Sequence, residues 1–86
     1  MLYIFYMSFE KKFLYFIKKE IYHDKKFNIS TKTNLLTLGI IDSMDFVKLL
    51  HKLEKNYKIK FKSHEINEEL GKLSNLKKVI KNKIKI

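Results

Sequence analysis

The sequence predicts an all-α fold: a small bundle of three longer helices and one short helix, with a long loop between helices one and two. Apolar residues recur at steps of three and four, which is the period of an amphipathic helix. The chain has no proline and only two glycines, so little interrupts helical segments. Its 86 residues, 45% of them hydrophobic, suffice for one domain with a modest core but leave no room for a deep active-site cleft.

The first helix is predicted over residues 9–22, with Ser8 as its N-cap. Its apolar residues would share one face and turn the lysines outward. These residues are Phe9, Phe13, Phe16, Ile17 and Ile21. We expect residues 1–7 to form a partly disordered leader, with Met7 as an alternative start, and residues 8–86 to form a single domain.

Residues 23–37 are polar and predict the long loop, anchored in the core by Phe27, Leu35, Leu36 and Leu38. Asp42 and Ser43 then open a second helix, whose broad apolar stripe suits burial against two neighbours. The stripe comprises Met44, Phe46, Val47, Leu49, Leu50, Leu53 and Tyr57.

Residues 58–61 alternate apolar and polar, but four residues alone make no sheet. We therefore expect an extended linker with Ile59 and Phe61 turned inward. A short third helix over residues 64–70 would be capped by Ser63 and ended by Gly71. The fourth helix would be capped by Ser74, with Leu76, Val79, Ile80 and Ile84 facing the core.

The chain is strongly basic, with a net charge of +10, and all 19 basic residues are lysine. Residues 40–70 hold six lysines and six carboxylates, so the excess lies outside this central part. A small basic nucleic-acid-binding protein is therefore an alternative of another class. The absence of arginine, which grips guanine and phosphate in two places, argues against it. The abundance of lysine, asparagine and isoleucine also fits an AT-rich genome, in which basicity partly reflects composition.

Several other functions are disfavoured by composition. The chain has no cysteine, so disulfides and thiolate metal sites are excluded, and any thiol must come from outside. His23, His51 and His64 lack the spacing of metal ligands. No apolar run approaches 18 residues, and the first residues lack a basic n-region, so we expect neither a membrane span nor a secretory signal but a cytoplasmic protein. The aromatic and lysine-rich N-terminus could lie on an anionic membrane surface, although a core helix explains the same pattern.

The most informative stretch is Leu38-Gly39-Ile40-Ile41-Asp42-Ser43-Met44. Gly39 permits a tight turn before the second helix, and Asp42 is well placed to cap it. Ser43 would then be exposed in the first turn, beside unpaired N–H groups and the positive end of the helix dipole. A phosphodiester at this position would be favoured by about 0.3–1 kcal/mol.

Together with Val47, Leu50, Leu53-Glu54 and Tyr57-Lys58-Ile59, this stretch resembles the attachment signature of acyl, peptidyl and D-alanyl carrier proteins. The resemblance covers most of the chain and extends to the order of the helices. It implies that a separate transferase, with magnesium, places 4′-phosphopantetheine from coenzyme A on Ser43, with Asp42 in a supporting role. The arm would supply the missing thiol and carry acyl or aminoacyl groups as thioesters, and the protein itself would not be an enzyme.

The resemblance also implies partner enzymes: a phosphopantetheinyl transferase, an acyl- or aminoacyl-loading ligase, and a downstream acyltransferase or synthase. The expected contact residues are Met44, Asp45, Val47, Lys48 and His51, although core packing explains Val47 equally well. We expect a monomer with no metal site, no bound nucleic acid and no stable membrane insertion.

The chain departs from fatty-acid carrier proteins on its second helix. Those proteins usually present carboxylates there, whereas this chain has Lys48, Lys52 and Lys55. The Ile40-Ile41 pair is more similar to D-alanyl and other aminoacyl carriers. Both differences favour a specialised biosynthetic pathway, such as one for a secondary metabolite, and a general fatty-acid carrier is the alternative.

Overall fold

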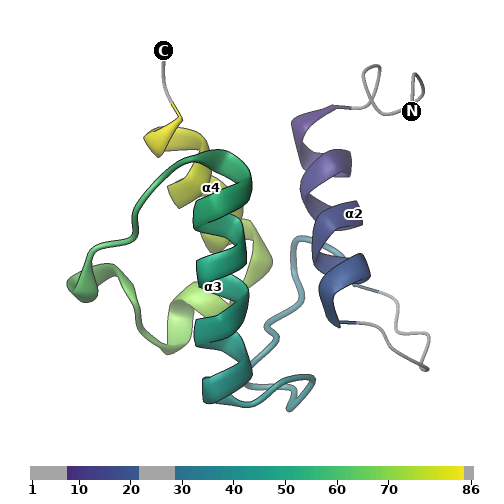
Figure 1. The fold of residues 1–86 in the computed structure, drawn as a ribbon. Coiled ribbons are helices and arrows are strands. Elements are labelled where there is room, and N and C mark those ends of the chain that lie inside the picture. The colour runs from purple at the N-terminus through teal and green to yellow at the C-terminus, as the bar shows by residue number, and fades with distance from the viewer. Residues whose placement is uncertain (1–7, 22–28, 85–86) are drawn as a thin grey trace.

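The computed structural model describes residues 8–21 and 29–84. Helices are labelled as in Figure 1. In chain order they are α2 (Phe9–Ile21), α3 (Ser43–Tyr57), the 3-10 helices η1 (Ser63–Glu65) and η2 (Glu68–Gly71), and α4 (Leu73–Lys83). The views from the front and from behind agree that α3 covers one side of α4, while α2 runs beside this pair (Figure 1). Within the described ranges no strand is formed, which confirms the all-α prediction.

The core is built from the apolar stripes of the three α-helices and closed by the loops between them. The periodicity predicted for α2 is confirmed, because Phe13 and Ile17 are fully buried and Phe9, Phe16 and Ile21 pack around them. The other buried side chains are Ile29, Leu35, Phe46, Leu49, Leu50, Leu53, Leu70, Leu73, Leu76 and Ile80. Burial of such side chains provides most of the folding free energy of a domain this small.

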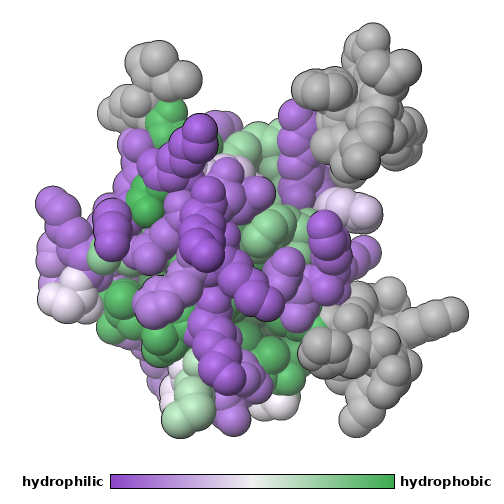
Figure 2. All heavy atoms as spheres, in the orientation of Figure 1, coloured by the Kyte–Doolittle hydropathy of each residue, from purple (hydrophilic) through white to green (hydrophobic). Residues whose placement is uncertain are grey.

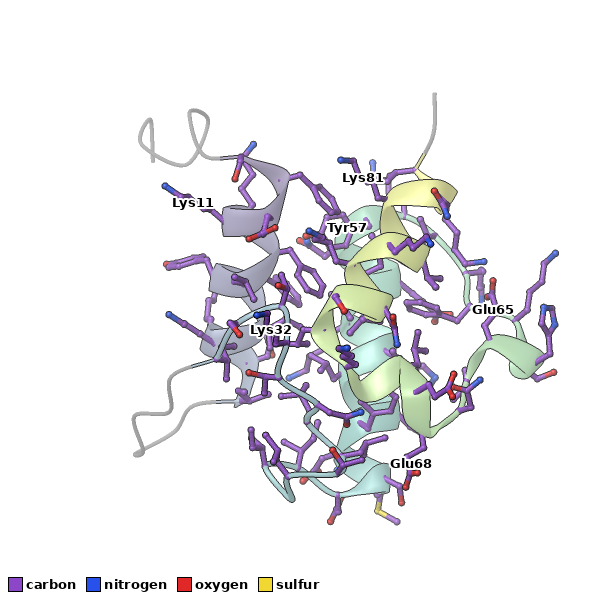
Figure 3. The ribbon with its side chains drawn as sticks, turned by 180° about the vertical axis from the view of Figure 1, so that it is seen from behind. Lys11, Lys32, Tyr57, Glu65, Glu68 and Lys81 are labelled. Carbon is purple, nitrogen blue, oxygen red and sulfur yellow. The ribbon has the colours of Figure 1, made fainter. Side chains whose placement is uncertain are left out.

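Aromatic contacts join α2 to the C-terminal end of α3. The ring of Tyr57 lies 5.8 Å from that of Phe9 and 6.5 Å from that of Phe16, both in tilted arrangements. Figure 3 shows Tyr57 between α2 and α4. Burial raises the pKa of the Tyr57 phenol above its ordinary value. These contacts hold the end of α3 that lies away from Ser43.

Two predicted helix boundaries are confirmed in detail. The Ser8 hydroxyl accepts a hydrogen bond from the N–H of Lys11, at 3.2 Å, so Ser8 does cap α2. At the other boundary, Lys58 ends α3 in the left-handed conformation, with φ of 56°. Residues 59–61 then follow without helix or strand, and both Ile59 and Phe61 pack against the core as predicted.

The prediction of a single short helix over residues 64–70 is wrong, since two 3-10 turns, η1 and η2, occupy this region. Asn67 between them is extended, with φ of −149°, and its side-chain oxygen accepts the N–H of Leu70 at 3.1 Å. This local bond competes with a continuous helix and starts a new turn instead. Ser63 is the first residue of η1 rather than its cap.

The predicted start of the last helix is also wrong. The helix α4 begins at Leu73, so Ser74 lies inside it and is not its N-cap. The reason is tertiary: the N–H of Leu73 donates to the carbonyl of Thr33 at 2.8 Å, and that of Ser74 donates to Thr31 at 2.7 Å. Loop carbonyls thus satisfy the first N–H groups of α4, and no capping side chain is needed.

One predicted loop anchor is wrong and two are confirmed. Leu35 is fully buried and Leu36 packs partly against the core, but Leu38 is 67% exposed. The chain turns tightly around the carbonyl of Leu35, and this turn places Leu38 on its outer side. The predictions for Phe27, His23 and residues 1–7 lie outside the described residues.

Asn34 and Gly71 join the loop before α3 to the end of η2. The N–H of Leu35 donates to the carbonyl of Gly71 at 2.9 Å, next to an isolated antiparallel bridge between Asn34 and Lys72. The side-chain oxygen of Asn34 accepts the N–H groups of Leu36 and Thr37 at 2.9 and 3.0 Å. A Cβ on Gly71 would lie 2.7 Å from this oxygen, so glycine is required here for close approach. We call these contacts the Asn34–Gly71 clamp.

Ion pairs connect the helices at the surface. Glu10 and Glu20 of α2 pair with Lys77 of α4 and Lys52 of α3, each at 2.7 Å. Glu65 pairs with Lys83 of α4 at 2.9 Å. Each exposed pair contributes about 0.2–1 kcal/mol, so these pairs adjust the stability of the bundle rather than determine it.

Glu65 makes the stability of the chain sensitive to acid. The Glu65 carboxylate accepts a hydrogen bond from the N–H of Lys62 at 2.6 Å and forms an ion pair with Lys83 (Figure 3). These two interactions lower the pKa of Glu65. Its stabilisation is therefore complete above the unfolded pKa of about 4.3 and is lost as pH falls through the lower, folded pKa. We expect Glu65→Gln to cost up to about 1 kcal/mol at pH 7.

Urea unfolding of both proteins at several pH values tests this. The difference between them should shrink progressively as pH falls below about 4 and through the lowered pKa of Glu65, because the Glu65 carboxyl then becomes neutral like glutamine. Glu69→Gln, an exposed carboxylate four residues along, serves as the control and should change little. A difference that stays constant between pH 7 and pH 3 would contradict the role given to the Glu65 carboxylate.

Candidate functional site

Ser43 is the first residue of α3 and its side chain is exposed. The preceding residue, Asp42, is the N-cap: its backbone is extended, with φ of −88° and ψ of 177°, and its Oδ1 accepts the N–H of Asp45 at 2.8 Å. The carbonyl of Asp42 accepts the N–H of Phe46 at 2.9 Å and so begins the helical ladder. The predicted capping by Asp42 is confirmed, and it leaves the Ser43 side chain in solvent at the head of the helix.

A tight turn brings the chain into this position. The carbonyl of Leu35 accepts the N–H groups of both Ile40 and Ile41, at 3.0 and 3.3 Å. Gly39 has φ of +69°, a conformation that side chains disfavour, and its N–H donates to Leu36 at 3.0 Å. The space around a Cβ at Gly39 is open, so here it is the backbone conformation and not crowding that requires glycine. The turn predicted at this position is confirmed.

The head of α3 offers hydrogen-bond donors to an anion. Among the described residues, the N–H groups of Ser43 and Met44 have no acceptor, while that of Asp45 is satisfied by the cap. Free first-turn N–H groups and the helix dipole favour a negative phosphate. A hydroxyl beside these donors therefore fits a phosphodiester, and the Asp42 carboxylate is engaged with the N–H of Asp45.

An open groove of about 420 Å³ lies beside Ser43. One wall comes from the start of α3, and the other from the segment between η1 and η2. Figure 3 places Glu68, on the second wall, at the end of the molecule where α3 begins. The lining residues are Leu36, Ile41, Asp42, Ser43, Phe46, Val47, Ile66, Asn67 and Glu68. Ile66 was not predicted as a site residue. The sequence marks it only as an apolar residue between polar neighbours.

The residues predicted to contact partners all lie on α3 near Ser43. Met44 is 70% exposed and Val47 is 43% exposed, and Val47 also lines the groove, so it is not a core residue. Lys48 and His51 are exposed. Asp45 is exposed as well, but it lines a separate pocket of about 270 Å³ between α2 and α3.

The described residues contain no group of histidines and carboxylates that could hold a metal ion. His51 and His64 lie exposed on separate elements, α3 and η1. None of the helices in the described ranges is both long and apolar enough to cross a bilayer.

A helical bundle that exposes a serine at a capped helix head, beside a groove, has the form of a carrier domain. Consistent with this, residues 19–80 match the family model described as "Phosphopantetheine attachment site". The chain therefore belongs to the phosphopantetheine attachment family, and 4′-phosphopantetheine, bound covalently, is its prosthetic group. Searches of curated proteins and of solved structures gave no match.

Loss of the cap should destabilise the site measurably. We expect Asp42→Ala to cost about 1 kcal/mol and to lower Tm by about 4–8 °C, because the N–H of Asp45 loses its acceptor. Asp42→Asn should retain most of the stability, since asparagine caps as well as aspartate. Thermal unfolding followed by circular dichroism measures both. Equal losses in the two variants would mean that charge, and not capping, is what Asp42 contributes.

Proposed function

We propose that this chain carries acyl or aminoacyl groups as thioesters on a 4′-phosphopantetheine arm attached to Ser43. The observation that supports this most directly is the exposed Ser43 hydroxyl at the head of α3, beside first-turn N–H groups without acceptors. Among the described serines, Ser63 begins a short 3-10 turn and Ser74 is partly buried inside α4. Only Ser43 combines exposure, a capped α-helix and the attachment motif.

In the attachment step, the Ser43 oxygen attacks the phosphorus of coenzyme A that bears the pantetheine. A P–O bond forms to serine, the pyrophosphate P–O bond breaks, and adenosine 3′,5′-bisphosphate leaves. The serine proton passes to a base of the transferase, because the adjacent carboxylate of this chain, Asp42, is engaged in capping the helix. Once attached, the arm supplies a terminal thiol that holds the cargo.

The chain's own residues bind and orient rather than catalyse. Asp42 fixes the helix head, the N–H groups of Ser43 and Met44 attract the phosphate, and the groove provides an apolar surface beside it. Residues 8–86 act as a single carrier domain and, in this proposal, as a cytoplasmic monomer. Its partners are a phosphopantetheinyl transferase, a loading ligase and an acyltransferase or synthase.

We place the chain in a specialised pathway rather than in general fatty-acid synthesis. The support is the exposed face of α3, where Lys48, Lys52 and Lys55 are all exposed. A partner that docks through a basic patch would be repelled by this face. The apolar groove beside Ser43 favours the general fatty-acid role instead, because Phe46, Val47 and Ile66 could contact an acyl chain. Loading assays with a fatty-acyl ligase and an aminoacyl-adenylating ligase of the same organism would separate these roles.

The attachment itself is tested with the purified apo protein. The chain is incubated with coenzyme A, magnesium and a broad-specificity phosphopantetheinyl transferase, and the intact mass is measured. The expected result is a gain of one phosphopantetheine, located by peptide mapping on the peptide that contains Ser43. A chain that stays unmodified with several transferases, or that is modified at another serine, would overturn the proposal.

A further inference from the structure

The exposed side of α3 carries a straight row of side chains that starts next to Ser43. Its members are Met44, Lys48, His51 and Lys55, and all four are exposed. Their spacing of four, three and four residues places them one above another along one face of the helix. We call these residues the α3 row. The α3 row is about 16 Å long, at a rise of 1.5 Å per residue. Figure 2 shows that hydrophilic side chains gather over α3 on the face turned to the viewer.

Two carboxylates of α3 flank this row: Glu54 shares a pocket with His51 and Lys55, and Asp45 shares one with Lys48. Glu54, the nearest acidic residue toward the end of α3, accepts the N–H of Phe61 at 2.8 Å and is held toward the linker. Asp45 lies on the side of α3 that faces α2, where it lines the pocket with Glu20. Glu20 is itself paired with Lys52 at 2.7 Å. Within the described residues Lys48 and Lys55 take part in no ion pair, so their charges face solvent.

We propose that the α3 row is a docking surface for partner enzymes whose binding surface is acidic. This inference rests on the function proposed above. An enzyme that acts at Ser43 must approach the head of α3, and a surface that covers Ser43 would also cover Met44 and Lys48. Charge complementarity then requires carboxylates on the partner opposite Lys48 and Lys55, and these would mainly raise the association rate and exclude partners with basic surfaces.

The composition of the surface favours a protein over a polyanion. Met44 and Val47 expose apolar area at the Ser43 end, which suits the apolar centre of a protein interface. The two lysines stand about two turns apart on the row, and the chain has no arginine to grip phosphates in pairs. The row thus has an apolar end at Ser43 and a basic end beyond it.

The test compares two charge-reversed proteins with the same net charge. In one, Lys48→Glu and Lys55→Glu reverse the row. In the control, Lys11→Glu and Lys18→Glu reverse two exposed lysines that are also seven residues apart, on α2. The phosphopantetheinyl transferase of the source organism modifies each apo protein, and KM and kcat are measured in low salt and in about 0.3 M salt, where exposed charges are largely screened.

We expect the row variant to raise KM about tenfold at low salt with kcat nearly unchanged, and the control to change KM less than about twofold. High salt should remove most of the difference in KM between the row variant and the wild type. An unchanged or lowered KM in the row variant would overturn the inference, and so would an equal rise in the control, which would indicate attraction by net charge alone. Full modification of all three proteins by excess transferase keeps the proposed function intact in either case. If the wild-type chain is never modified, both the proposed attachment at Ser43 and the proposed docking through the α3 row are contradicted.

Duplex DNA and vesicles of anionic lipid are the second set of probes. We expect each probe to bind the row variant as weakly as it binds the control. Loss of binding in the row variant alone would show that the row serves a polyanion and would overturn the assignment to a protein partner.

Discussion

Replacing Ser43 with alanine is expected to abolish phosphopantetheine attachment while leaving the fold intact. The substitution removes the one oxygen in the motif that could form the phosphodiester. The side chain is exposed and forms no hydrogen bond to the described residues, and alanine is compatible with the first turn of a helix. We therefore expect the free energy of unfolding to change by less than about 0.5 kcal/mol. Intact-mass measurement after incubation with coenzyme A and transferase should show no gain.

Two other serines provide matched controls for this experiment. Ser63→Ala changes an exposed serine at the start of η1, and Ser74→Ala changes one in the first turn of α4. Both variants should gain the same mass as the wild type. If Ser43→Ala were still modified, or if only one of the control variants lost the modification, the attachment site would have to be moved to another residue.

Replacing Phe13 with alanine is expected to have the largest effect on stability. Phe13 is fully buried in α2 and stacks with Phe9 at 6.4 Å between ring centroids. Its loss removes apolar contacts and leaves a cavity, at a cost of about 3–5 kcal/mol. A domain of this size has a total stability of about 5–15 kcal/mol, so the variant would be close to unfolding. Thermal unfolding should show Tm lower by at least about 10 °C.

The control for Phe13 lies two residues along the same helix. Tyr15 is 52% exposed, so Tyr15→Ala removes an aromatic ring from solvent-facing surface and should cost less than about 1 kcal/mol. If both variants lost stability equally, α2 would not pack on the core through the face that contains Phe13 and Ile17.

The sequence predicted those parts of the fold that depend on local patterns. The apolar periodicity of α2 and α3, the cap at Asp42 and the turn at Gly39 each follow from residues within a few positions of one another. Three features were mispredicted, and each depends on contacts with distant residues or on competing local bonds. The start of α4 is set by Thr31 and Thr33, the short third helix is divided at Asn67, and Leu38 is turned outward by the loop.

The candidate site, like the fold, was predicted from the sequence only in part. The head of α3, with Asp42 and Ser43, was predicted because capping residues and the attachment motif are adjacent in sequence. The second wall of the groove was not predicted, because Ile66 reaches the groove only through the arrangement of η1 and η2 around Asn67. No periodicity in the sequence encodes that arrangement, since the two turns are too short to show one.

The Asn34–Gly71 clamp has a consequence for how this sequence can evolve. A methyl group at position 71 would collide with the amide oxygen of Asn34 and crowd Leu36, which lies 3.1 Å away. Position 71 can therefore accept a side chain only when position 34 becomes smaller and Leu36 shifts. Among relatives that share this loop, substitutions at the two positions should occur together, although the two positions are 37 apart in the chain.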